Sequence, residues 1–226
     1  EYVLTAPPRE DPASGQSVYG PLAEHLSSLL GEKVVYQHPG DWRSYERKMR
    51  AGEYDIIFDG PHFAAWRIEQ GMAHPLVKLP GRLDFVVVVR ADQPGIKDVQ
   101  SLIGKRVCVL PSPNLTAMTA YSMFQNPMRQ PQFISVRGGN PQVAAKVADG
   151  DCVAGVLRRS FYEKKLDHTH RQAMRVLAQS QPLTNQGITV SDRLAPEARR
   201  KMASALLTDD GRKAAGSLLG RFGSPE

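Results

Sequence analysis

The sequence predicts an α/β protein, and two observations carry this prediction. Short apolar segments rich in valine, isoleucine and leucine recur along the 226 residues, and segments of helical spacing lie between them. This alternation is typical of mainly parallel sheets covered by helices on both faces. The run Phe85–Val89 is apolar at every position, as expected of a strand buried on both faces.

The first part of the chain predicts three strands, each followed by a helix. Prolines end the first strand because each one removes a backbone donor. Leucines at helical spacing before Gly31 predict the first helix, and Asp41 is placed to cap the second. The expected strands are 2–6, 33–36 and 54–58, and the expected helices are 19–30, 42–51 and 61–70.

The rest of the chain continues the pattern, for a total of about ten strands. The turn at 92–95 contains proline and glycine, and a domain boundary is expected near it. Residues 181–187 are interpreted as a return crossing between domains. The expected strands are 76–79, 85–89, 106–110, 132–136, 152–157 and 174–178, and the expected helices are 98–105, 115–125, 141–149, 196–206 and 209–220.

Composition indicates an ordinary globular protein with a modest positive charge. Hydrophobic residues make up 41% and charged residues 23%, and the net charge is +6. Basic residues are scattered, and no basic–aromatic stripe of the kind that binds nucleic acid is present. The positive field instead favours an anionic ligand or an anionic membrane surface.

Compartment is left open by these observations. No run of about 18 apolar residues occurs. The stretch from Glu1 lacks the features of a signal peptide, which fits either a cytoplasmic protein or a processed secreted one. Cys108 and Cys152 could form a disulfide or remain buried thiols, and they show no metal-binding spacing.

Two proline-stiffened turns are the strongest local candidates for a binding site. In Phe58–Phe63 and in Pro111–Thr116, an apolar strand ends in a turn that opens a helix. Ligands bind at such places in open α/β sheets, because helix N-termini offer backbone N–H groups to an anion. The alternatives are an ordinary strand-to-helix turn at Gly60 and a purely structural N-cap at Asn114.

Several of these stretches together resemble the phosphonate/phosphite-type, PhnD-like family of periplasmic solute-binding proteins of ABC importers. The resemblance covers nearly the whole chain in order. It is carried by Tyr19–Ala23, by Tyr54–Trp66, by the apolar strand before Arg90, and by Ser112–Thr116.

The resemblance implies a type II periplasmic-binding-protein fold with two lobes, residues 1–88 plus 186–226 and residues 89–185, joined by a two-strand hinge. A small oxyanion such as phosphonate, phosphite or phosphate would lie in the cleft between the closing lobes. The protein would deliver it to an inner-membrane permease. It would be a periplasmic monomer, with or without a lipid anchor, without cofactor or metal. The compartment favours a disulfide between Cys108 and Cys152.

The sequence departs from the family pattern at the expected site. Phosphonate binders carry several hydroxyl residues at 113–117, whereas here only Thr116 keeps a hydroxyl. Asp59 stands where the family has an aromatic residue, and near a dianion it would need a proton, a hydrogen bond or a cation such as Arg9. Arg158 and Arg159 lie where aminoalkylphosphonate binders have a carboxylate, which disfavours a ligand amine.

The combined expectation is a ligand site without catalytic residues. Trp42 retains the family's aromatic character at the start of the second helix. The expected ligand-binding residues are Arg9, Trp42, Asp59, Gly60, Pro61, His62, Ser112, Asn114, Leu115, Thr116, Arg158 and Asn185.

Two other functions fit the same fold. The first is a ligand-sensing domain of a signalling receptor, which would continue into a transmembrane helix after Glu226. The second is an enzyme, which would need an acid in the cleft, and Asp59 is the candidate for it. No nucleophile–base pair supports catalysis, so an enzyme is not expected.

Overall fold

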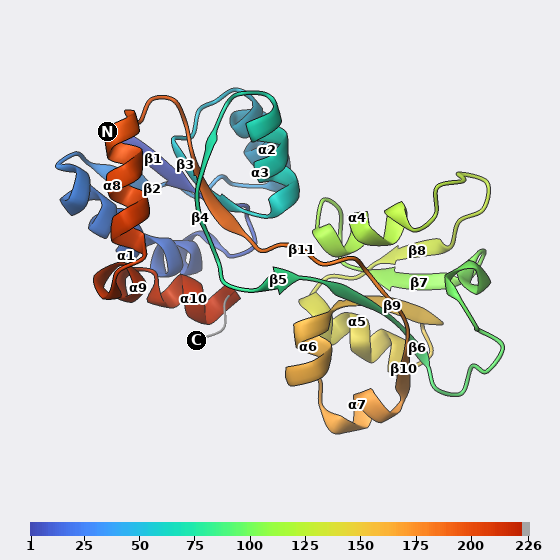
Figure 1. The fold of residues 1–226 in the computed structure, drawn as a ribbon. Helices are drawn as coiled ribbons and strands as arrows, with labels where there is room; N and C mark the ends of the chain where they lie inside the picture. Colours follow the sequence, from blue (N-terminus) through green and yellow to red (C-terminus); the bar gives the residue numbers. More distant parts are fainter. Residues whose placement is uncertain (223–226) are drawn as a thin grey trace. The chain divides into compact units, whose positions relative to one another are not determined.

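The computed structural model describes residues 1–222, which divide into two compact units (Figure 1). The first unit combines Glu1–Gly81 with the segment that begins at Thr184, and the second is Arg82–Leu183. The chain passes between them twice, in β5 (Arg82–Leu83) and β11 (Leu183–Thr184), which pair as a two-stranded sheet. The expected boundary after residue 88 falls inside β6 (Phe85–Arg90), a strand of the second unit.

The first unit is built on a five-stranded mixed sheet with the order β2-β1-β3-β12-β4. The first three strands along the chain are parallel, so their carboxyl ends share one edge of the sheet. Strand β12, which arrives from the C-terminal part of the chain, runs antiparallel to both of its neighbours. The strands are β1 (Tyr2–Thr5), β2 (Val34–Tyr36), β3 (Ile56–Asp59), β4 (His74–Lys78) and β12 (Gly187–Val190).

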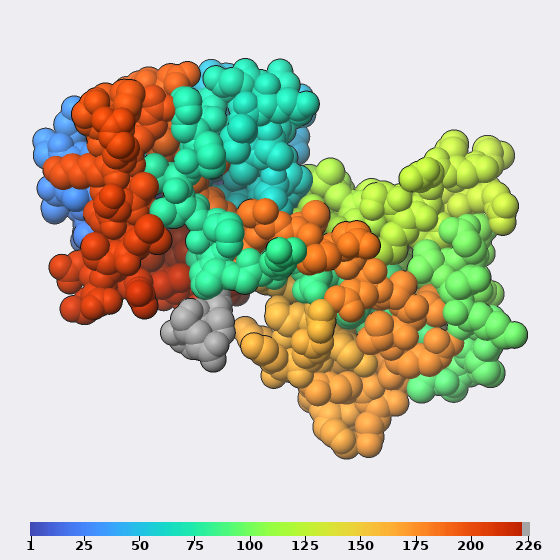
Figure 2. Space-filling view, viewed as in Figure 1, coloured from blue at the N-terminus to red at the C-terminus, as the bar shows by residue number. Residues whose placement is uncertain are grey.

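Six helices pack around this sheet, and the core of the unit includes Leu22 and Leu26 of the first helix with Met202 near the C-terminus. In Figure 2 the red C-terminal helices accordingly lie beside the blue N-terminal ones. The helices are α1 (Pro12–Leu30), α2 (Trp42–Arg50), α3 (Pro61–Glu69), α8 (Pro196–Leu206), α9 (Asp209–Ala214) and α10 (Gly216–Phe222).

Helix α1 begins seven residues earlier than the leucine spacing predicts, at Pro12 instead of residue 19. The Asp11 carboxylate accepts the N–H groups of Ala13 and Ser14, so it caps the helix at that point. Pro12 then occupies the first turn, where its missing N–H has no intrahelical partner to lose.

The second unit also has a five-stranded mixed sheet, with the order β10-β6-β9-β7-β8. Strands β7, β8 and β9 are parallel and share a carboxyl edge, whereas β6 is antiparallel to both of its neighbours. The valines of β6 are almost fully buried, as the continuous apolar run predicts. The other strands are β7 (Arg106–Val109), β8 (Gln132–Ser135), β9 (Ala154–Arg158) and β10 (Met174–Gln179).

Short helices connect the strands of the second unit. They are the 3₁₀ helix at Val99–Leu102 and the α-helices α4 (Leu115–Ser122), α5 (Gly139–Ala148), α6 (Arg159–Lys164) and α7 (His168–Gln172).

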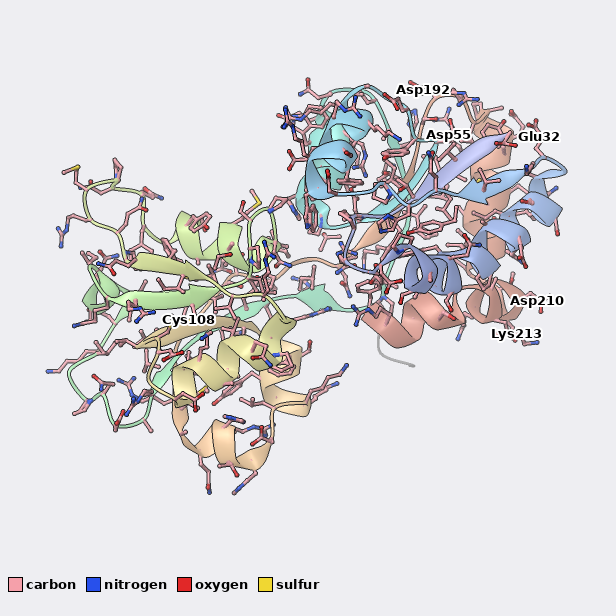
Figure 3. All side chains as sticks on the ribbon, turned by 180° about the vertical axis from the view of Figure 1, so that it is seen from behind. Glu32, Asp55, Cys108, Asp192, Asp210 and Lys213 are labelled. Carbon is pink, nitrogen blue, oxygen red and sulfur yellow. A yellow bond between two sulfur atoms is a disulfide. The ribbon has the colours of Figure 1, made fainter. Side chains whose placement is uncertain are left out.

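A disulfide joins two of the neighbouring strand regions of this unit. Cys108 lies in β7 and Cys152 immediately precedes β9, and their Cα atoms are 5.8 Å apart. Figure 3 labels Cys108 in the sheet. Both residues are almost completely buried, at 0% and 1% exposure. The bond therefore crosslinks the sheet inside its core and not at the surface.

The predicted α/β class with mixed sheets is confirmed, but parallel pairs do not predominate. Each large sheet has two parallel and two antiparallel pairings. The sequence analysis missed β12, α6 and α7, which are all short. None of the helices within residues 1–222 is both long and apolar enough to cross a membrane.

Candidate functional site

The turn from β3 into α3 forms as the sequence predicts. Strand β3 ends at Asp59, Gly60 is the N-cap residue, and Pro61 lies in the first turn of α3. Gly60 has φ −73°, so the left-handed freedom of glycine is not what the turn needs. A Cβ atom at Gly60 would instead lie 2.8 Å from Cε1 of His62. A side chain at this position would therefore displace the imidazole ring of His62.

Asp59 is buried at the end of β3, with 0% exposure. Its carboxylate accepts two hydrogen bonds from the Arg67 guanidinium, at 2.7 and 2.9 Å, and a third from the Tyr45 hydroxyl. Of the alternatives left open for Asp59, a proton, a hydrogen bond or a cation such as Arg9, the structure shows hydrogen bonds and a cation, and the cation is Arg67. The structure thus gives Asp59 internal partners, and its carboxylate does not reach an exposed surface.

Burial and ion pairing set the protonation of this cluster. Burial, together with the negative charge of Asp59, raises the pKa of Tyr45 well above its ordinary value. Burial alone would lower the pKa of Arg67, but the hydrogen bonds and charge of Asp59 outweigh it, and the pKa is raised. The tyrosine therefore stays neutral and donates, while the arginine stays charged.

Arg67 was missed by the sequence analysis. It lies on α3 four residues after Phe63, and both side chains are buried, at 2% and 9% exposure. A spacing of four places residues on one helix face. The signal that could have identified the Asp59–Arg67 pair is an arginine on the apolar face of a helix that directly follows an aspartate at the end of an apolar strand.

The other candidates of the first unit lie near this turn or in the crossover. Trp42 is half-buried and stacks on Phe63, with ring centroids 6.2 Å apart. Arg9 follows β1, whose carboxyl end shares an edge with that of β3. Its guanidinium lies 5.0 Å from the centre of the Phe222 ring. Asn185 is 5% exposed and donates to the Pro80 carbonyl at 2.7 Å, so its amide stabilises the crossover.

The second turn, from β7 into α4, is organised by Asn114. Its Oδ1 accepts the backbone N–H of Thr116 at 3.0 Å and the Thr116 hydroxyl at 2.5 Å, which makes it the N-cap of α4. Thr116 is 2% exposed, so its hydroxyl proton is used inside the turn. Within the described residues, the structure records no hydrogen bond from the Asn114 amide nitrogen. Ser112 is exposed and Leu115 is half-buried beside them.

Arg158 reaches the same edge from a neighbouring strand. It is the last residue of β9, which runs parallel to β7. Its backbone N–H donates to Oδ1 of Asn140 at 3.0 Å, at the start of α5. Asn140 therefore joins the helix that follows β8 to the end of β9, two strands that flank β7 in the sheet, and it was not predicted from the sequence. The neighbouring Arg159 is ion-paired with Asp84 and Glu163.

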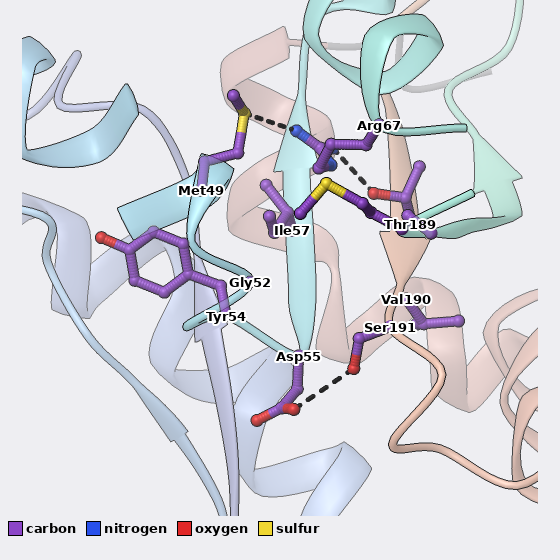
Figure 4. A pocket seen from close by; sticks show the side chains of 11 residues that line it. Met49, Gly52, Tyr54, Asp55, Ile57, Arg67, Thr189, Val190 and Ser191 are labelled. Carbon is purple, nitrogen blue, oxygen red and sulfur yellow. Dashed lines mark hydrogen bonds between the residues drawn. The ribbon is translucent and has the colours of Figure 1, made fainter. Parts of the chain in front are cut away.

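A small pocket in the first unit reaches Arg67 but not the two candidate turns (Figure 4). Its lining includes Tyr54, Asp55, Arg67, Thr189 and Ser191. Of the twelve predicted ligand-binding residues, all of which are described, none lines it. Among residues 1–222, no group of three or more His, Cys, Asp or Glu side chains could hold a metal ion.

The sequence of this chain is similar to those of known solute-binding proteins. Residues 4–224 match the family described as "ABC transporter, phosphonate, periplasmic substrate-binding protein". The phosphate-import protein PhnD of Mycolicibacterium smegmatis is 22% identical over 91% of this chain and 71% of its own length.

Solved structures show the same fold. XAC2383 from Xanthomonas citri, bound to chloride ion, has a TM-score of 0.79 and 20% identity, over 96% of this chain and 87% of that one. PhnD1 from Prochlorococcus marinus, in complex with methylphosphonate, has a TM-score of 0.71 and 15% identity, over 97% and 88%.

This likeness shows that the chain has the two-lobed fold of periplasmic binding proteins, with two mixed sheets and a two-strand crossover. Together with the match along almost the entire sequence, this places the chain among non-enzymatic solute-binding proteins. The chain belongs to the family of phosphonate-type periplasmic substrate-binding proteins of ABC transporters.

Proposed function

We propose that this protein is the periplasmic solute-binding component of an ABC importer, and that its ligand is a small phosphonate-, phosphite- or phosphate-like oxyanion. Its partner is a permease of the inner membrane. The main observation in favour of an anionic ligand is that each unit has a helix N-terminus at the carboxyl edge of its sheet. At the carboxyl edge of each sheet, a strand leads directly into a helix N-terminus, β3 into α3 and β7 into α4.

The names of the relatives support a negatively charged ligand. Those of the three relatives described above mention phosphate, chloride and methylphosphonate. These ligands differ in size and chemistry and share their negative charge. The names of the relatives therefore support an anionic ligand in general. The proposal of a small oxyanion depends in addition on the helix N-termini and on membership of the phosphonate-type family.

The distribution of charge also favours an anion. The second unit contains 14 arginine and lysine residues and seven acidic residues, a net charge of +7. The first unit contains 15 basic and 16 acidic residues, a net charge of −1. The positive field that draws an anion thus comes from the second unit.

Asn114 is the side chain of the second unit best placed to donate to the ligand. Its oxygen is occupied by the two hydrogen bonds from Thr116, which fixes the amide and orients its nitrogen. Fixed donors bind an oxyanion more strongly than mobile ones, because less ordering is needed on binding. Thr116 contributes mainly by holding Asn114.

A thermal-shift panel tests the ligand class. The panel contains phosphate, phosphite, methylphosphonate, an aminoalkylphosphonate, sulfate and small carboxylates. An anion at 100 times its dissociation constant should add about 2.7 kcal/mol to the free energy of unfolding. We expect a phosphonate, phosphite or phosphate to give the largest shift and the aminoalkylphosphonate a smaller one. If none of these anions shifts the melting temperature, the proposal is wrong.

The substitution Asn114→Asp tests the donor. Aspartate caps a helix as well as asparagine does, so stability should change by less than about 0.5 kcal/mol. The new carboxylate cannot donate and repels an anion, so affinity for the best ligand of the panel should fall at least about 10-fold, a loss of about 1.4 kcal/mol. Isothermal titration calorimetry measures the change.

Asn126→Asp is the matched control. Asn126 also lies in the second unit, and its Oδ1 also accepts the backbone N–H two residues later, that of Met128 at 2.9 Å. It lies in the loop that leads to the amino end of β8, whereas Asn114 follows the carboxyl end of the parallel strand β7. Affinity should stay unchanged in this control. Equal losses in both variants would indicate a general effect of charge instead of a contact at Asn114.

A further inference from the structure

Arg67 makes four hydrogen bonds in the interior of the first unit. Its guanidinium donates to both carboxylate oxygens of Asp59, to Oγ1 of Thr189 at 2.7 Å and to Sδ of Met49 at 3.1 Å. Figure 4 shows Arg67 between Met49 and Thr189. The side chain is 3% exposed, so these contacts are made in the interior of the unit.

These contacts join four elements at one point. Asp59 belongs to β3, Arg67 to α3, Thr189 to β12 and Met49 to α2, which also contributes the Tyr45 hydroxyl bond to Asp59. The turn Asp59–His62 lies between the two residues of the ion pair. The pair therefore holds both ends of the segment that presents the N-terminus of α3.

The bond to Thr189 extends this connection toward the crossover. Strand β12 begins three residues after β11, by which the chain returns from the second unit. Thr189 pairs with Ile57 of β3 in the sheet. Through its side chain, Arg67 thus fixes the 59–62 turn to the strand that continues from the crossover.

Stability alone does not account for such a pair. Burying two charges costs desolvation free energy that their attraction roughly offsets, and an apolar replacement of equal volume is often as stable. Each fixed donor does, however, restrict the position of its acceptor. A binding site needs its groups held to within about 0.5 Å by the residues behind them.

We propose that Arg67 is a positioning residue of the ligand site: through Asp59 and Thr189 it holds the 59–62 turn in the orientation that binds the anion, without touching the anion itself. This inference rests on the proposed function. It assigns to the buried ion pair a role in affinity that is separable from its role in folding.

The protein contains a matched control for this proposal. Asp55 immediately precedes β3, and its side chain is also 0% exposed. Arg193 contacts both of its carboxylate oxygens, at 2.9 and 3.1 Å. The two pairs thus bracket the same strand, one at the carboxyl edge of the sheet beside the candidate turn and one at the amino edge. The same Arg→Lys change can be made in each.

The test compares Arg67→Lys with Arg193→Lys in the full chain. Lysine keeps the charge but cannot make the two-pronged bond to a carboxylate. Affinities for phosphate and methylphosphonate are measured by isothermal titration calorimetry at a temperature where melting curves show every variant folded. We expect Arg67→Lys to weaken binding at least about 10-fold, the effect that loss of an outer partner has at metal sites. Arg193→Lys should leave affinity within about twofold of wild type, since it changes no contact at the turn.

Thr189 provides a gentler variant that keeps the ion pair intact. Thr189→Val preserves shape and removes the hydroxyl, and we expect a loss in affinity of about 2- to 10-fold, as for one hydrogen bond. Thr189→Ser restores the hydroxyl and should restore binding. Rescue by serine distinguishes a positioning bond from general packing, because serine packs less well than valine at this buried site.

The outcomes separate the two proposals. If wild-type protein binds and the Arg67 and Thr189 variants bind equally well, positioning by Arg67 is excluded while the proposed function stands. If both Arg→Lys variants weaken binding alike, the effect is general destabilisation and the inference is also wrong. If wild-type protein binds no anion of the panel, the proposed function and the inference fail together.

Discussion

Replacement of Asp59 by alanine is expected to lower the free energy of unfolding of the first unit by about 3–5 kcal/mol. The substitution leaves the Arg67 charge buried, at 2% exposure of the residue, with no carboxylate beside it. It also removes the acceptor of the Tyr45 hydroxyl, which burial leaves without access to water. Urea unfolding followed by circular dichroism measures the loss.

A second substitution tests whether the unpaired Arg67 charge causes the loss of stability. In the double variant Asp59→Ala, Arg67→Met, the uncompensated charge is gone, so much of the lost stability should return. Asp192→Ala is the control, because its carboxylate is 69% exposed and its ion pairs within residues 1–222 are with His74 and Arg199. That change should cost less than about 1 kcal/mol. Strictly additive losses in the double variant would contradict a buried ion pair.

Reduction of the disulfide is expected to lower the free energy of unfolding of the second unit by about 4 kcal/mol. Cys108 and Cys152 are 44 residues apart. A crosslink that closes a loop of this length lowers the conformational entropy of the unfolded chain, which raises the free energy of unfolding by about 4 kcal/mol. The relevant comparison is oxidised against reduced wild-type protein, because both have the same sequence and differ only in the disulfide and the two thiol hydrogens that replace it.

The double variant Cys108→Ala, Cys152→Ala serves as the control for this prediction. It should be at least as unstable as the reduced protein, since it lacks the crosslink and also loses two buried sulfur atoms. Reductant should have no effect on it. A reduced wild-type protein as stable as the oxidised one would show that the bond does not form or does not constrain the unfolded state.

Local pattern was sufficient for the elements that surround the candidate site. The β3 and α3 segments were predictable because an apolar run followed by Gly60 and Pro61 has few other conformations. Asn114 was predictable as an N-cap for the same reason. The burial of β6 followed from its continuous valines.

Strand direction and long-range partners were not predictable in this way. Strand β12 has only four residues, and nothing local indicates that it pairs antiparallel with β3 and β4. Thr189 lies 122 residues from Arg67 in the sequence, so their contact exists only once the sheet has formed. The same holds for the assignment of Asp59: its sequence neighbourhood suggests an exposed turn, whereas its tertiary partners place it in the interior.

The position of β12 in the first sheet has a consequence for the order in which the two units can fold. The strand lies between β3 and β4, yet the ribosome synthesises it after the entire second unit. During synthesis β4 therefore has no strand beside it, and the first unit cannot complete its sheet. The second unit is continuous in sequence and can fold once its own residues are available. It can therefore fold first, whereas the first unit cannot complete its sheet until β12 is present.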